Sequence, residues 1–135
     1  MFITREDLNM SLYEEIIDAI TRKDVNRETY GIRTAEAEVT AKLAVRFDVD
    51  FIFSKTGNDR NAVVVDIVAN IALYIIADVL EEMPVTIQSA YDRSIALLDE
   101  LQTGKATLFG IPEPTNPETG EKDTYIRFGN SSSRY

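Results

Sequence analysis

Cysteine and histidine are both absent from the 135 residues of this chain. Disulfides, thiolate nucleophiles, imidazole bases and the usual zinc ligand sets are therefore excluded. These absences remove most of the familiar catalytic arrangements. We accordingly expect no catalytic residues, no bound metal, no cofactor and no enzymatic activity.

Long uninterrupted apolar runs are also missing. The N-terminus carries polar and charged residues at positions 4–7, where an export signal would need an apolar run. The most apolar stretch, residues 62–80, is interrupted by Asp66, Asn70 and Asp78, and each of these side chains is costly at bilayer depth. The sequence therefore predicts a soluble protein that makes no membrane contact.

The formal net charge is −9, and the acidic excess is confined to the first hundred residues. Residues 101–135 hold four acids and four bases. Because DNA affinity comes largely from lysine and arginine on phosphates, a chain of this charge is not expected to bind DNA directly. A length of 135 residues fits one compact core.

Apolar residues at helical spacing predict a small all-α bundle of about five helices. The widest apolar stripe belongs to a central helix that begins after Asn61, a candidate N-cap. Pro84 separates this helix from the last one, which Gly104 is placed to end. Residues 49–53 could either extend the preceding helix or form a packed turn. The expected helices cover residues 5–10, 11–21, 32–47, 62–80 and about 85–103.

Two short motifs bear a partial likeness to ligand-binding loops. Asp48 and Asp50 are spaced as in the start of a calcium loop, but Phe53 occupies the position that requires glycine. These acids are more simply read as closing a helix. Gly104 and Lys105 resemble part of a phosphate loop that lacks its first glycine, and a helix precedes them where a strand should. We interpret them as a helix C-cap.

Three polar residues interrupt the central helix and leave two interpretations open. Asp66, Asn70 and Asp78 either mark the one polar edge of that helix or take part in a subunit contact.

The composition changes at Gly110, where three prolines follow within eight residues and apolar periodicity stops. We therefore divide the chain into a helical domain, residues 1–109, and an extended C-terminal arm, residues 110–135. A short run of strand formers, Thr124–Phe128, lies in the arm. At about 3.3 Å per residue the arm could reach about 85 Å.

Aromatic residues in the arm lie outside any core that the helices can form, and a disordered tail would not need them. The strand could fold back on its own domain, or it could be an anchor given to a neighbouring chain. The candidate partner-contact residues are Tyr125, Ile126, Arg127, Phe128 and Tyr135.

Several segments in order resemble the phage Mu-type family of head-tail connector (adaptor) proteins. The resemblance covers roughly residues 1–109. It is carried by the opening Phe-Ile-Thr-Arg-Glu-Asp-Leu, in which Arg5 stands where the family has proline, and by the helix-ending Leu101-Gln102-Thr103-Gly104-Lys105. The segments 34–47 and 62–80, which lie in two of the expected helices, have the right order and length. The aromatic segment 50–53 and the long arm depart from the family pattern.

The resemblance implies a structural virion protein that is assembled in the host cytoplasm. Its partners would be other copies of itself in a ring, commonly a dodecamer, together with the portal protein and a tail or stopper protein. DNA would pass through the ring without specific binding. From another functional class, an acidic inhibitor that mimics DNA would also explain the charge, although it leaves the neutral arm unexplained.

Overall fold

The computed structural model describes residues 2–8 and 10–114, which form α-helices and 3-10 helices and contain no strand. This confirms the all-α bundle. The strand predicted at residues 124–128 lies outside the described part of the chain. The elements are η1 (Arg5–Leu8), α1 (Met10–Lys23), α2 (Arg27–Leu43), α3 (Val49–Phe53), η2 (Gly57–Asp59), α4 (Ala62–Ala77) and α5 (Val85–Thr103).

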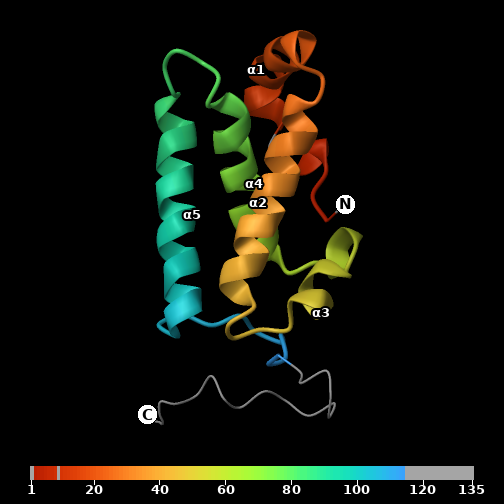
Figure 1. The fold of residues 1–135 in the computed structure, drawn as a ribbon, viewed down its shortest axis with the longest axis vertical. Helices are drawn as coiled ribbons and strands as arrows, with labels where there is room; N and C mark the ends of the chain where they lie inside the picture. The colour runs from red at the N-terminus through yellow and green to blue at the C-terminus, as the bar shows by residue number, and fades with distance from the viewer. Residues whose placement is uncertain (1, 9, 115–135) are drawn as a thin grey trace.

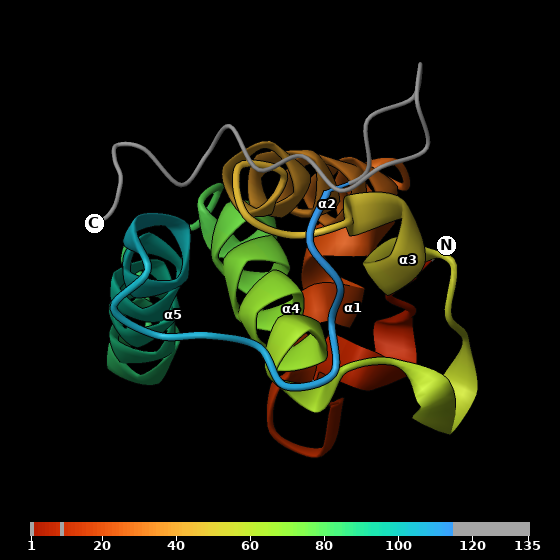
Figure 2. The same cartoon turned by 90° about the horizontal axis from the view of Figure 1, so that it is seen from below.

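The bundle is built around α4, which packs between α2 and α5 (Figures 1 and 2). These three helices run alongside one another, while α1 covers the end of the bundle opposite α3 (Figure 1). The helix α4 is buried over most of its circumference because its stripe of branched apolar residues is too wide for a surface helix. Ile67, Ile71 and Ile76 are fully buried, and each contributes about 1.5–3 kcal/mol through burial.

Gly31 allows the closest approach between α2 and α4. A Cβ atom added at this position would lie 2.6 Å from Cγ1 of Ile76 and 3.2 Å from the carbonyl oxygen of Ala72. Gly31 is a buried residue within α2, although the sequence predicted that this helix would begin after it, at residue 32. Glycine costs about 1 kcal/mol of helix propensity relative to alanine, and here that cost accompanies close packing of the two helix backbones.

A hydrogen bond and an aromatic stack are among the contacts that join α4 to α5. The amide of Asn70 donates a 2.9 Å hydrogen bond to the hydroxyl of Ser94, which is only 3 % exposed. Tyr74 and Tyr91 stack with ring centroids 3.8 Å apart. Of the three polar residues in α4, Asn70 therefore makes a hydrogen bond between two helices of the bundle, whereas Asp66 and Asp78 are exposed.

The ends of the long helices are fixed by identifiable residues. Asn61 accepts hydrogen bonds from the backbone N–H groups of Val63 and Val64, which confirms it as the N-cap of α4. Gly104 ends α5 in the left-handed conformation, with φ of 92°, and this confirms the predicted C-cap. The guanidinium of Arg46 donates to the carbonyl oxygen of Leu101 in the last turn of α5.

The helices differ in extent from the expected ones. The first expected helix is a 3-10 turn, separate from α1. The helix α2 covers Arg27–Leu43 instead of 32–47. It begins earlier because Gly31 lies inside it, and it ends earlier because Phe47 packs against the core from the turn that follows. The central helix ends at Ala77 and not at Leu80. In its last turn, the guanidinium of Arg27 donates a hydrogen bond to the carbonyl oxygen of Ile75.

The undecided segment 49–53 forms a helix of its own, α3, with Ile52 buried in the core. Asp48 accepts a 3.1 Å hydrogen bond from the backbone N–H of Phe51. The expectation that these acids close a helix was therefore wrong, because Asp48 opens one as its N-cap.

The described chain continues beyond α5 across the end of the bundle, towards α3 (Figure 2). Leu108 is buried and Ile111 packs against the core. The backbone N–H of Asp48 donates a 2.9 Å hydrogen bond to the carbonyl oxygen of Pro112. The division at residue 109 remains a prediction, but residues through Pro112 are in contact with the bundle.

Candidate interaction surface

The five residues predicted to contact a partner, Tyr125, Ile126, Arg127, Phe128 and Tyr135, lie outside the described residues. The candidate sites that the structure does describe lie on the surface of the bundle.

A furrow runs along the outer side of α2. Two hollows, of about 690 and 560 Å³, share Arg33 and Ala37 in their walls and so form one continuous feature, which we name the α2 furrow. Arg33, Ala37 and Ala41 follow one another at intervals of four and make a single row on the helix. The two alanines are exposed, and their small side chains leave the furrow open. Its remaining lining residues are Phe2, Asn26, Thr29, Tyr30, Thr34, Glu36, Thr40, Phe53, Lys55 and Thr56.

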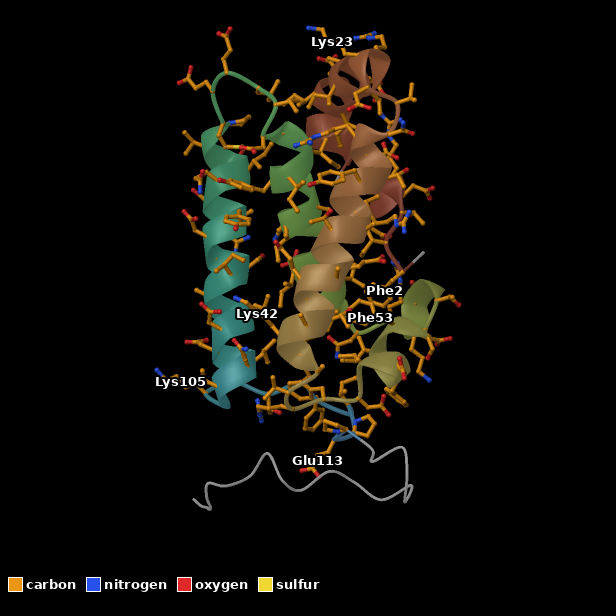
Figure 3. All side chains as sticks on the ribbon, viewed as in Figure 1. Phe2, Lys23, Lys42, Phe53, Lys105 and Glu113 are labelled. Atoms are coloured by element: carbon orange, nitrogen blue, oxygen red, sulfur yellow. The ribbon has the colours of Figure 1, made fainter. Side chains whose placement is uncertain are left out.

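The wall opposite α2 is aromatic. Phe2 and Phe53 meet edge to face with ring centroids 4.7 Å apart (Figure 3). Phe53 is the last residue of α3, so the cap at Asp48 also positions this wall. Tyr30, which is 54 % exposed, lies at the other end of the furrow.

Arg60 holds the N-terminal segment of the wall in place. Its guanidinium makes two hydrogen bonds to the carboxylate of Asp7, at 2.8 and 3.0 Å, and donates to the carbonyl oxygen of Phe2 at 2.8 Å. The hydrogen bonds from Arg60 hold the pKa of Asp7 below its usual value of 3.8, against the opposing effect of burial. The same pair raises the pKa of Arg60.

The furrow carries more positive than negative charge, unlike the chain as a whole. Arg33 and Lys55 line it, and neither takes part in an ion pair within the described residues. The ammonium of Lys55 lies 4.2 Å from the ring centre of Phe51. The one carboxylate in the furrow, Glu36, accepts a 3.1 Å hydrogen bond from the backbone N–H of Ile3. The furrow is therefore suited to an acidic segment that also carries aromatic or apolar side chains.

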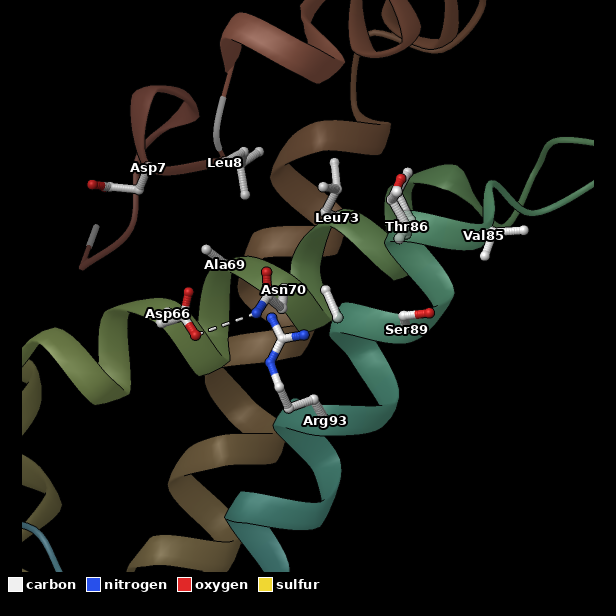
Figure 4. Close-up of a pocket in the computed structure, with 12 residues that line it drawn as sticks. Asp7, Leu8, Asp66, Ala69, Asn70, Leu73, Val85, Thr86, Ser89 and Arg93 are labelled. Atoms are coloured by element: carbon white, nitrogen blue, oxygen red, sulfur yellow. Dashed lines mark hydrogen bonds between the residues drawn. The ribbon is translucent and has the colours of Figure 1, made fainter.

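A second hollow of about 540 Å³ lies between α4 and α5. Arg93 extends towards Asp66 and Asn70 (Figure 4), and the amide of Asn70 lies 3.4 Å from the carboxylate of Asp66. The hollow is lined by two acids, Asp7 and Asp66, and one base, Arg93, but its polar network also joins the two helices through Ser94. We interpret it as part of the packing between α4 and α5.

Among the side chains that the structure describes, no three acidic residues lie close enough together to hold a metal ion. Within the described part of the chain, no helix is long and apolar enough to cross a membrane. Gly104 and Lys105 stand at the end of α5, and the backbone N–H of Gly104 donates to the carbonyl oxygen of Glu100. That contact belongs to a helix C-cap.

A protein-family model described as Bacteriophage Mu, Gp36 matches residues 2–126. The chain belongs to this family. The match spans the described bundle and reaches into the arm as far as Ile126, farther than the resemblance seen in the sequence. No curated protein and no solved structure matches the chain significantly.

Membership of the Gp36 family makes this a phage-related protein, consistent with the helical bundle. The α2 furrow was not foreseen from the sequence, because Arg33, Phe2 and Lys55 lie on three segments that only the fold brings together. The one local signal was the spacing of Arg33, Ala37 and Ala41, which places small side chains on the exposed face of an amphipathic helix.

Proposed function

We propose that this member of the Gp36 family is a structural virion protein, a head-tail connector subunit that assembles as a ring between the portal and the tail. Membership of the family over residues 2–126 is the observation that carries the proposal. The small helical bundle and the absence of cysteine and histidine fit a role in assembly better than one in catalysis.

The charge of the protein supports a conduit for DNA. A net charge of −9 repels phosphates, so a channel lined by these subunits would let a duplex slide without adhering to the wall. The exposed residues of α5 contribute to this charge with Asp92, Asp99 and Glu100. In the proposed ring, acidic faces of this kind line the channel.

The C-terminal arm would attach the subunit to another chain of the assembly. Fixing a backbone residue costs about 1–2 kcal/mol, so one short segment binds weakly by itself. Many copies around a ring raise the effective concentration of each further contact and secure the attachment. Residues 124–128 and Tyr135 are the part of the arm that we expect to bind.

The proposal is tested by mixing the purified chain with the portal protein of the same phage and separating the mixture on a density gradient. We expect the chain to migrate with the portal. A variant ending after Pro114 keeps the contacts of Ile111 and Pro112 with the bundle, and it should remain folded but migrate apart from the portal. Equal binding by the full and shortened chains would contradict the role of the arm.

The alternative is an acidic DNA mimic that occupies the basic groove of a DNA-binding enzyme, and the net charge of −9 favours it. The same preparation distinguishes the two proposals. A chain that does not bind the portal protein, stays monomeric and inhibits a DNA-binding enzyme stoichiometrically would support the DNA mimic and contradict the connector proposal.

A further inference from the structure

We infer that the α2 furrow is a binding site for the acidic and aromatic segment of the chain's own arm, residues 118–128, in the unassembled subunit. This site is distinct from the contacts through which the arm would hold other chains of the virion. The inference rests on the charge of the furrow, its aromatic ends and the place where the described chain ends.

The charges of the two parts are complementary. The furrow contains Arg33 and Lys55, and its one acid is hydrogen-bonded to the backbone N–H of Ile3. Residues 118–128 of the arm carry three acids, Glu118, Glu121 and Asp123, and two bases, Lys122 and Arg127, and all three acids lie in the first six residues. On a protein with a net charge of −9, a surface with a local excess of positive charge is a specific place for such a segment to bind.

The described chain ends close to the furrow. The carbonyl oxygen of Pro112 is bonded to the N–H of Asp48, the residue before α3, and Phe53 at the other end of α3 lines the furrow. Five helical residues rise only about 7.5 Å. The four residues from Pro114 to Glu118 can extend about 13 Å, so the acidic stretch can reach the furrow of the same chain.

The lengths and the order of residues also agree. From Ala41 to Tyr30, α2 rises about 17 Å, and the six residues Glu118 to Asp123 span about the same distance when extended. An arm that enters beside Phe53 places its acids along Lys55 and Arg33. Tyr125 and Phe128 then follow at the end where Tyr30 is exposed.

A helical furrow is also the kind of receptor that this fold provides. Residues 2–8 and 10–114 contain no strand, so the bundle offers no sheet edge to which an arm strand could be added. An arm that folds back on its own domain must therefore lie in a groove beside helices. Aromatic side chains packed on exposed alanines and aromatic rings would provide the apolar part of the contact.

The absence of cysteine allows a direct test by disulfide formation in the full chain. Ala37 is exposed and lines both hollows of the furrow, and in the register above it lies beside Gly120 of the arm. A variant with Ala37→Cys and Gly120→Cys should therefore form an intrachain disulfide at micromolar concentration. The matched control joins Gly120→Cys to Ala96→Cys, an exposed position on α5. We expect the furrow pair to oxidise about tenfold faster than the control pair.

Charge variants test the specificity of the same contact. Adding Arg33→Glu and Lys55→Glu should reduce the oxidation rate of the furrow pair to that of the control pair, and adding Glu118→Lys and Glu121→Lys as well should restore it. Arg93→Glu with Lys105→Glu, two exposed bases outside the furrow, should leave the rate unchanged. Circular dichroism of the reduced proteins verifies that each variant remains folded.

Three results would overturn the inference. They are equal rates for the furrow and control pairs, a furrow rate that does not respond to the charge reversal, and disulfide-linked dimers in place of the intrachain product, which would identify a second copy as the occupant. The test uses no portal, so the inference and the proposed function can fail separately.

Discussion

Replacing Gly31 by alanine is expected to destabilise the protein, although alanine is the better helix former. In α2 the exchange alone would gain about 1 kcal/mol of helix propensity. The added methyl group, however, would stand 2.6 Å from Cγ1 of Ile76 and 3.2 Å from the carbonyl oxygen of Ala72. Neither atom is the free end of a flexible side chain, so relief requires the two helices to move apart.

The balance of these effects sets the size of the change. Overpacking of a well-packed core costs about 1–3 kcal/mol, which offsets the gain in propensity and leaves a net loss of up to about 2 kcal/mol. The propensity part can be measured in the neighbouring α5 with Ala96→Gly, because Ala96 is exposed and lies outside the α2 furrow. This control should lose about 1 kcal/mol from propensity alone.

Urea unfolding followed by helical circular dichroism measures both changes, provided that the slope of the transition stays constant. A double-mutant cycle with Ile76→Ala identifies the cause. When the Ile76 side chain is shortened, Gly31→Ala should become neutral or stabilising, because the methyl group then fills vacated space. If Gly31→Ala stabilises the otherwise unaltered protein by about the amount of the propensity difference, the close packing of α2 on α4 is refuted.

Three further changes test other parts of the structure. Ile71→Asp places a charge in the core of α4 and should abolish the helical signal at 25 °C; full helicity with an unchanged melting temperature would refute the core assignment. Asp7→Asn should cost about 1–3 kcal/mol at pH 7 in urea unfolding. Because Arg60 lowers the pKa of Asp7 in the folded state, this contribution is present above the unfolded pKa of about 4 and disappears as the pH falls further, so the two proteins should converge in acid. Asn70→Ala leaves the buried hydroxyl of Ser94 without this donor and should cost about 1 kcal/mol, which a matched change at exposed Asp66 should not.

Local patterns predicted the features of the fold that depend on nearby residues. The apolar stripe of α4, the cap at Asn61 and the left-handed Gly104 were all predicted, because each follows from residues within one or two turns. The extent of α2 was not, since the glycine at position 31 is the usual sign of a helix boundary. Its place inside the helix is explained by Ile76, forty-five residues farther along the chain.

The candidate site was harder to predict for the same reason. The sequence indicated which aromatic residues of the arm are candidates for binding, Tyr125 and Phe128, but not the surface to which they could bind. The α2 furrow depends on Arg60 holding Phe2 beside Phe53, a contact between three separate segments. No periodicity in a single segment reports such a contact.

Electron cryomicroscopy of the chain mixed with its portal protein tests the proposed function most directly. We predict a closed ring of copies coaxial with the portal, with acidic helical surfaces facing a channel wide enough for a duplex and with the arm bound to another chain. Portal particles without added density, together with a chain that remains monomeric, would contradict the proposal that this Gp36-family protein is a head-tail connector.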